Sequence, residues 1–265
     1  MLRAGLRITN ARGSAKRLHA KDAQRESMKI DIVNFVDGAR NAEGIAVVID
    51  VFRAFSVACY CFSKGVSKIY PIGDVDDAYD LVKSFDDGIL VGERKGKKLP
   101  GFDYGNSPTE IMAANLLGKA VVHTTHAGTQ GLVNAVNADE VLTGAFVNAK
   151  ATAKYIKDRN PDKVTLVKMG LEAKSQSDED DLCAEYIKML LNNQPFDETA
   201  IVETLCNSPY SERFFDPDKP WCPSSDFDLC LDMNRFSFAL RSIPDETGNL
   251  HLEKVNVDMA EGNRW

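Results

Sequence analysis

Several charged and hydroxyl side chains of this sequence directly follow short apolar runs. Asp50 and Arg53 come at the end of one such run, and Glu93 and Arg94 follow another. If each run is a strand of a parallel sheet, the residues after it lie at the carboxyl edge, where open α/β sheets bind ligands. Further residues of this kind are Thr124, Thr125, Gly128, Thr129, Asn148, Glu179, Asp180 and Asp181.

These residue types can bind an anion together with a hard divalent cation. Backbone N–H groups at helix starts and glycine turns bind phosphate or sulfonate oxygens. An arginine can contact such a group through two N–H donors at once. Carboxylates bind Mg²⁺, which usually takes one or two of them and completes its shell with water or substrate oxygen. The sequence therefore predicts a site for a phosphorylated or sulfonated small molecule and a divalent cation.

Each of these residues also has a purely structural interpretation. Asp50 could cap the helix that follows it, and Arg53 could be a solvated residue of that helix. The acidic run 178–181 stands at a helix start, where carboxylates stabilise the helix dipole. His126 is a candidate general acid, but a lone histidine is more often a bystander. The residues alone leave these alternatives open.

One unusually long connection in the sequence is the glycine-rich, basic stretch 92–110. Ser107 is the predicted N-cap of the next helix, and Glu110 completes a capping box. Asp103 and Asn106 either contact a ligand or only shape turns. We expect a held, anion-binding loop in which three lysines are solvated: Lys95, Lys97 and Lys98.

The elements that position these residues alternate along the chain. Strands are expected at 29–35, 45–51, 68–72, 89–91, 120–124, 140–143 and 163–169, and helices at 53–64, 74–85, 108–117, 128–136, 149–159 and 178–191. This alternation predicts an α/β fold with a largely parallel or mixed sheet covered on both faces. After Pro195 the expected elements are helices at 197–206 and 226–233 and strands at 236–241 and 250–257.

Composition narrows the class of protein. The formal net charge of −7 over 265 residues disfavours a nucleic-acid partner, and no apolar run is long enough for a membrane span. The six cysteines show no metal-ligand spacing, which indicates reduced thiols in a cytoplasmic protein. Residues 1–27 carry seven basic and two acidic residues. We expect a peripheral basic extension there, followed by a single α/β domain over 28–265.

Familiar catalytic signatures are absent from the sequence. It contains no GxxxxGK[ST] loop, no GxGxxG after a strand and no GxSxG elbow. Phe52 stands where a two-aspartate phosphatase motif beginning at Asp50 would need its second aspartate. That motif therefore gives no support for Asp50 as a nucleophile.

Taken together, six segments of the chain resemble the 2-phosphosulfolactate phosphatase family. They are Val47–Ala54, Gly92–Arg94, Gly101–Pro108, Thr124–Thr129, Gly144–Asn148 and Glu179–Ala184. The block Gly-Phe-Asp-Tyr-Gly-Asn-Ser-Pro is the most specific of them. The resemblance implies helix–sheet–helix layers with two related halves. It also implies a Mg²⁺-dependent phosphoric monoester hydrolase of 2-phosphosulfolactate in coenzyme M biosynthesis.

The resemblance also suggests roles for the strand-end residues. The predicted catalytic residues are Asp50, Arg53, Glu93 and Arg94. The predicted substrate contacts are Asp103, Asn106, Thr124, Thr125, Gly128, Thr129 and Asn148. The predicted Mg²⁺ ligands are Asp50, Glu93, Glu179, Asp180 and Asp181. Whether Asp50 serves as metal ligand, base or nucleophile is left open, as is homo-oligomer formation.

One departure from the family pattern bears on the substrate. The family turn usually reads Thr-Thr-x-Asn-Gly-Thr, whereas this chain has Ala127 in place of the asparagine. Because this amide is missing, the chain is also compatible with a variant family member that acts on a different substrate, such as another small phosphorylated hydroxy acid. The alternatives are a non-catalytic binder of a phosphorylated or sulfonated metabolite, and an enzyme of another type such as a phosphotransferase or isomerase.

Overall fold

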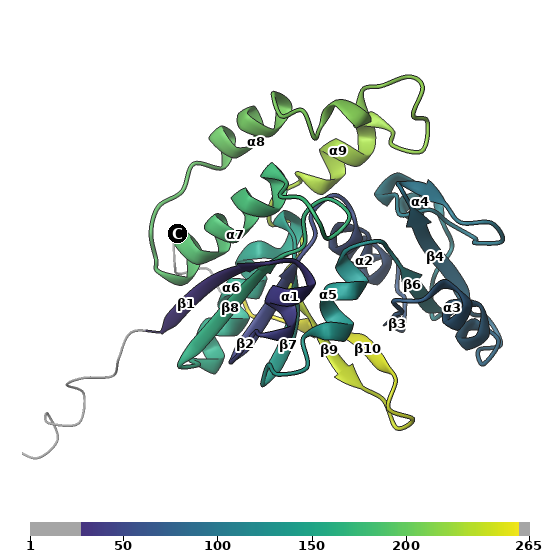
Figure 1. Ribbon diagram of the computed structural model, residues 1–265, viewed down its shortest axis with the longest axis horizontal. Coiled ribbons are helices and arrows are strands. Elements are labelled where there is room, and N and C mark those ends of the chain that lie inside the picture. The colour runs from purple at the N-terminus through teal and green to yellow at the C-terminus, as the bar shows by residue number, and fades with distance from the viewer. Residues whose placement is uncertain (1–27, 260–265) are drawn as a thin grey trace, which may run out of the picture.

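A ten-stranded mixed sheet runs through the protein, whose computed structural model describes residues 28–259 (Figure 1). Its strand order is β1-β8-β2-β7-β9-β10-β3-β6-β4-β5, with helices packed against it. The predicted α/β class is confirmed. The basic extension predicted for residues 1–27 lies outside the described residues. Within residues 28–259, every helix is too short or too polar to cross a membrane.

All the strands and helices expected from the sequence are present. The strands are β1 (Lys29–Asn34), β2 (Ile45–Ile49), β3 (Lys68–Pro71), β4 (Ile89–Arg94), β5 (Lys97–Lys98), β6 (Ala120–Thr124), β7 (Glu140–Gly144), β8 (Lys163–Lys168), β9 (Phe238–Pro244) and β10 (Leu250–Asn256). The helices are α1 (Phe35–Arg40), α2 (Ala54–Ser63), α3 (Val75–Val82), α4 (Pro108–Ala113), α5 (Gly128–Asn134), α6 (Ala149–Arg159), α7 (Asp178–Leu191), α8 (Glu198–Cys206) and α9 (Ser224–Cys230). Two short 3₁₀ helices are η1 (Phe146–Asn148) and η2 (Glu212–Phe214).

The stretch 92–110 differs from its prediction as one long loop. Its first part is a β-hairpin, in which Glu93 and Arg94 of β4 pair with β5. Lys95 and Gly96 form the two-residue turn, with φ of 54° and 79°. Positive φ at both central residues is typical of the type I′ hairpin turn. The sequence showed only a basic, glycine-rich stretch because Lys-Gly is a weaker turn signal than Asn-Gly.

The sheet consists of two parallel blocks that a hairpin joins. The blocks are β1-β8-β2-β7 and β3-β6-β4, and the antiparallel pair β9-β10 lies between them. The strands of one block run opposite to those of the other, so the sheet is mixed, which is one of the two predicted arrangements. Neighbouring strands of a sheet are rotated by about 20–25° relative to each other. Summed across the sheet from β2 to β4, this rotation turns the carboxyl ends of both blocks toward one side. That the two halves are related stays a prediction.

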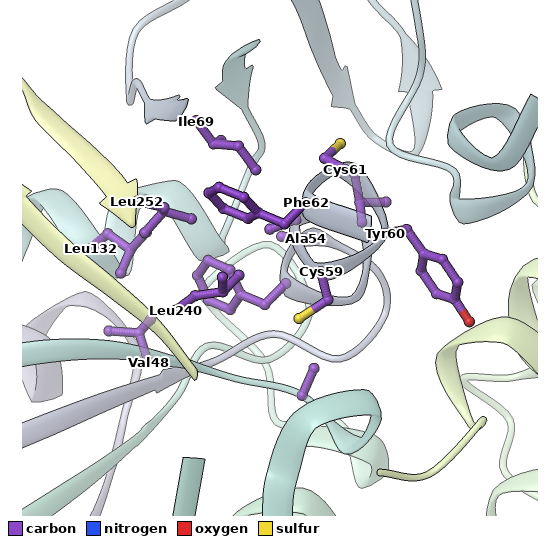
Figure 2. Packing of buried hydrophobic residues seen from close by; sticks show 14 of the residues in the cluster. Val48, Ala54, Cys59, Tyr60, Cys61, Phe62, Ile69, Leu132, Leu240 and Leu252 are labelled. Carbon is purple, nitrogen blue, oxygen red and sulfur yellow. The ribbon is translucent and has the colours of Figure 1, made fainter. Parts of the chain in front are cut away.

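Helix α2 occupies the space between the two blocks. Every residue from Ala54 to Phe62 is buried, as expected for a helix that is apolar all round. Figure 2 shows its side chains packed among residues of both blocks, the hairpin and α5: Val48, Ile69, Leu132, Leu240 and Leu252. This packing fixes the start of α2, and with it the residues that follow β2, relative to both halves of the sheet.

Candidate active site

The carboxyl ends of β2, β4, β6 and β8 open into one cavity of about 300 Å³. Pockets for small metabolites begin at about this size. Five carboxylates line it: Asp50, Glu93, Glu172, Glu179 and Asp180. Basic side chains line it as well: Arg53, Lys95, Arg213 and Lys219. The cavity therefore combines groups that can bind an anion with groups that can bind a cation, although Arg53 is the one basic residue of this lining that was predicted from the sequence to contact the substrate.

Asp50 sits where two helices begin. Its Oδ1 accepts a hydrogen bond from the backbone N–H of Ala54 at 3.2 Å, so the helix-capping interpretation holds alongside any chemical role. Gly128, the first residue of α5, packs so closely that a Cβ there would lie 2.8 Å from Asp50 Oδ2. Burial raises the pKa of Asp50 to about 6, and the negative charge of Glu93 contributes to the rise.

The acidic run at the start of α7 divides between the cavity and the surface. Asp180 accepts hydrogen bonds from the backbone N–H groups of Val51 at 2.9 Å and Gly170 at 2.7 Å, which ties together the ends of β2 and β8. Burial raises the pKa of Asp180 above its usual range. Asp181 instead forms a 2.6 Å ion pair with Lys168 and does not line the cavity, so its metal role stays a prediction.

Glu179 faces the cavity beside an arginine that the sequence analysis missed. Its Oε2 is buried and has no hydrogen-bond partner among the described residues, while Oε1 lies 3.7 Å from Arg213. Burial raises the pKa of Glu179 to about 7, and the charge of Arg213 opposes this rise. Arg213 comes from η2, donates to the carbonyl of Phe52 at 3.3 Å, and lies over aromatic rings. No spacing in the sequence connects it with the strand ends.

Glu93 joins the hairpin turn to the turn that follows β6. Its Oε1 accepts from the backbone N–H of His126 at 2.9 Å, and its Oε2 from that of Gly96 at 2.6 Å. Lys95 is exposed, as predicted, but its side chain also forms part of the cavity lining. Lys97 lies over the ring of Trp221, with its Nζ 4.3 Å from the ring centroid.

Arg53 is held on one side of the cavity and is 4% exposed. Its Nη1 donates to Asp226 Oδ2 at 2.5 Å and to the carbonyl of Trp221 at 2.8 Å. Its Nη2 donates to the carbonyl of Gly96 at 3.3 Å. The interpretation of Arg53 as a solvated helix residue is therefore wrong, whereas its contact with substrate stays a prediction.

Arg94 points away from the cavity into a neighbouring, more open hollow. It donates to the carbonyls of Glu93 at 2.7 Å and Gly73 at 3.2 Å, and to Thr124 Oγ1 at 3.0 Å. His126 lines both hollows, and its Nδ1 is buried without a hydrogen-bond partner in the described part of the chain. The catalytic role of Arg94 stays a prediction.

The polar residues near β6 stabilise turns or face the cavity. Thr125 and Thr129 bond reciprocally, with Thr129 Oγ1 donating to the Thr125 carbonyl at 3.0 Å. Asn106 lines the cavity, and its Oδ1 lies 3.2 Å from Nε2 of buried His123. Because a carbonyl oxygen only accepts, His123 is the donor. Burial lowers the pKa of His123 to about 4, so its ring is neutral near pH 7. The Asn106 amide is thereby oriented with its NH₂ free to serve a ligand.

Of the seven predicted substrate contacts, only Asn106 lines the cavity; Asp103, Thr124, Thr125, Gly128, Thr129 and Asn148 do not. Asn148 is fully buried, and its Nδ2 donates to the carbonyl of Phe238 at 3.3 Å. Asp103 is exposed, and its Oδ2 accepts from the backbone N–H of Leu90 at 2.8 Å. Both contacts hold backbone segments together, so a substrate role for either residue stays a prediction.

Replacing Asp103 with alanine is expected to leave turnover unchanged and to cost about 0.5–1.5 kcal/mol of the free energy of unfolding. The lost hydrogen bond anchors Leu90 at the start of β4 and does not reach the cavity. Urea unfolding and phosphate-release kinetics of the purified variant measure the two quantities. A large loss of turnover with wild-type stability would instead place Asp103 on the substrate.

The carboxylates of the cavity fit Mg²⁺ by their chemistry. They offer hard oxygen donors, and the unpartnered Oε2 of Glu179 is an acceptor without a donor. Among residues 28–259, however, no three Asp, Glu, His or Cys side chains are grouped closely enough to hold an ion by themselves. This agrees with a cation that keeps most of its water and takes only one or two protein carboxylates.

Comparison with known proteins gives one consistent family. Residues 31–216 match the family described as 2-phosphosulpholactate phosphatase. The probable 2-phosphosulfolactate phosphatase of Bacillus subtilis (strain 168) is 34% identical over 188 residues, which cover 70% of this chain and 81% of the relative. A protein of the same description from Carboxydothermus hydrogenoformans is 40% identical over 168 residues, covering 63% and 69%. One from Clostridium perfringens is 34% identical over 185 residues, covering 67% and 74%.

Proposed function

The chain belongs to the 2-phosphosulfolactate phosphatase family, and from this premise we propose that it hydrolyses a small phosphorylated sulfo-hydroxy acid, such as 2-phosphosulfolactate, to the hydroxy acid and phosphate. The observation that carries the proposal is the cavity itself. Buried carboxylates together with arginine and lysine side chains line a space of metabolite size. Such a cavity suits a ligand that brings its own negative charges.

The basic side chains that line the cavity would bind the anionic groups of the substrate. Arg53 and Arg213 both line the cavity, and guanidinium groups match the oxygens of phosphoryl and sulfonate groups. Lys95 and Lys219 add positive charge on the same lining. The amide of Asn106 donates a further hydrogen bond. Together these groups would hold a phosphate at one end of the substrate and a second acid group at the other.

The cavity carboxylates would hold Mg²⁺, with Glu179 as one ligand, because its Oε2 has no hydrogen-bond partner among the described residues, and with Asp50, whose charge acts on Glu179, as the other. When bound, Mg²⁺ would supply positive charge that offsets the charge on the phosphoryl oxygens. Arg53 and Arg213 would keep the phosphoryl group in line with an attacking water. As the new P–O bond forms, the ester P–O bond breaks; a cavity carboxylate would take up a proton of the water, and this proton would pass to the oxygen of the leaving hydroxy acid.

The test is phosphate release from a panel of esters that includes 2-phosphosulfolactate and 2-phospholactate, with Mg²⁺ or with a chelator. We expect release that the chelator abolishes and added Mg²⁺ restores. Release from no ester would overturn the proposed hydrolysis, and release indifferent to the chelator would overturn only its metal part. Preference for 2-phospholactate would indicate a drifted substrate at Ala127, which lines the cavity. Cytoplasmic location and a place in coenzyme M biosynthesis remain predictions.

Replacing Arg213 with methionine is expected to raise KM for the phosphate ester about 10- to 100-fold, because hydrogen bonds to charged groups contribute about 1.5–3 kcal/mol. Methionine keeps the apolar packing over Phe52 and Phe214 and removes only the charge and the donors. Arg235→Met is the matched control, because Arg235 also lies over aromatic rings but does not line the cavity. Steady-state kinetics should show the rise in KM for Arg213→Met and not for Arg235→Met. An equal change in KM for the two variants would contradict an anion-binding role of Arg213.

A further inference from the structure

We propose that Asp226 is a positioning residue of the active site, which clamps the Arg53 guanidinium so that its remaining N–H donors face the phosphoryl group. This role rests on the proposed function, because that function supplies the phosphoryl group. Asp226 lies beyond residues 31–216, so the match to the family does not reach it.

The Asp226 carboxylate is fully buried and joins three segments that are distant in the sequence. Its Oδ2 pairs with Arg53 Nη1 at 2.5 Å, just after β2. Its Oδ1 accepts from Ser107 Oγ at 2.8 Å and from the backbone N–H of Thr109 at 2.9 Å, at the start of α4. One side chain of α9 thus fixes both the cavity arginine and the turn that follows Asn106.

The donors of Arg53 show what the clamp leaves free. A guanidinium has five N–H donors in a fixed plane. Asp226 and the carbonyls of Trp221 and Gly96 take three of them. One N–H on Nε and one on Nη2 have no partner among the described residues, while Arg53 lines the cavity. Two such donors are the number needed to bind two oxygens of a phosphoryl group.

The clamp also restricts where the charge of Arg53 can go. An unpaired guanidinium beside several cavity carboxylates would be free to turn toward them and would lose its orientation. The ion pair with Asp226, which does not itself line the cavity, instead holds the positive charge in one place. The free donors are then pre-organised for charge that develops in the transition state, which is where fixed donors accelerate a reaction most.

The experiment compares Asp226→Asn and Asp226→Glu with Ser225→Ala. Ser225 is the matched control, because its Oγ bonds Thr109 Oγ1 at 2.7 Å across the same pair of helices but does not contact Arg53. We expect Asp226→Asn to lower kcat about 10- to 100-fold, the usual cost of losing an outer-shell partner, with a smaller change in KM. Ser225→Ala should keep wild-type kcat. Equal kinetics for these two variants would overturn the positioning role.

Asp226→Glu covers the case in which the asparagine variant fails to fold. Glutamate keeps the charge but adds a methylene, so it moves the guanidinium in a folded protein. We expect kcat to fall here too, because misplacement of about 1 Å can cost about 100-fold. Wild-type kinetics in a folded Asp226→Glu variant would overturn the proposal.

A binding readout separates this proposal from the proposed function. Orthovanadate is the probe, because it adopts the geometry of a phosphoryl group in transfer. Its binding is measured by the fluorescence of Trp221, which lines the cavity, in a protein whose other tryptophan, Trp265, is replaced by phenylalanine. We expect Asp226→Glu to weaken vanadate binding more than inorganic phosphate binding, and Ser225→Ala to change neither. If the wild type releases phosphate from no ester, the proposed function fails, while this comparison still decides the role of Asp226. Equal vanadate affinity in all variants would overturn it.

Discussion

Asp50→Asn is expected to lower phosphate release by about 10²–10⁴-fold, the range that a carboxylate acting on a proton in the transition state contributes. The side chain lies at the end of β2, on the cavity, with backbone contacts at Ala54 and Gly128. Asparagine keeps the shape and the acceptor that caps α2, so the loss would come from the charge. Phosphate-release kinetics with saturating Mg²⁺ measure it.

Asp197→Asn is the matched control for this variant. Asp197 also caps a helix, accepting from the backbone N–H groups of Thr199 and Ala200, but it does not line the cavity. If Asp50 served only as a cap, the two variants would lose similar stability and both would keep turnover. That outcome would remove Asp50 from the chemistry. A phosphoaspartate trapped on the wild type, but not on Asp50→Asn, would identify Asp50 as the nucleophile.

The fold could be predicted from the sequence wherever local signals were long and had clear ends. The bounds of α6 and α7 agree with their predictions because each helix carries more than two turns of pattern. The short α1 was missed because its six residues follow β1 without a break that the sequence marks. The hairpin at 95–96 was missed for a similar reason, since its turn uses lysine where asparagine is the stronger signal.

The site was easiest to predict where a strand leads straight into it. Asp50 and Glu93 reach the cavity in this way, because chain order places them just beyond β2 and in β4. Arg213 lines the cavity and Asp226 contacts Arg53 from the segment after Pro195, where the alternation of strands and helices stops. Their position depends on how that segment packs back over the sheet edge, and no local pattern encodes such packing.

The acidic run at the start of α7 shows a further limit of the sequence. Four consecutive carboxylates appear equivalent there, and Glu179, Asp180 and Asp181 were all predicted as metal ligands. Successive residues of a helix point about 100° apart, so they cannot all face one cavity. The structure turns Glu179 inward, engages Asp180 with backbone N–H groups, and pairs Asp181 with Lys168.

Glu179→Gln and Asp181→Asn are therefore expected to differ sharply, although the residues are two apart on one helix. Glu179→Gln should lower turnover about 10²–10³-fold, as the loss of one group that offsets transition-state charge commonly does. It should also raise the Mg²⁺ concentration needed for half-maximal activity. Asp181→Asn removes a half-exposed ion pair with Lys168, and such pairs contribute at most about 1 kcal/mol to stability. Its turnover should match the wild type.

Titrating each variant with Mg²⁺ at a fixed, saturating ester concentration distinguishes the two carboxylates. Removing the negative charge of Glu179 also leaves Arg213 without the carboxylate that lies 3.7 Å from it. The expected loss in Glu179→Gln should therefore appear in the Mg²⁺ dependence, whereas a change confined to the KM of the ester would implicate Arg213 instead. If Asp181→Asn loses as much activity as Glu179→Gln, the acidic run 178–181 acts through its combined charge on the helix dipole. The inward orientation of Glu179 would then have no special role in the reaction.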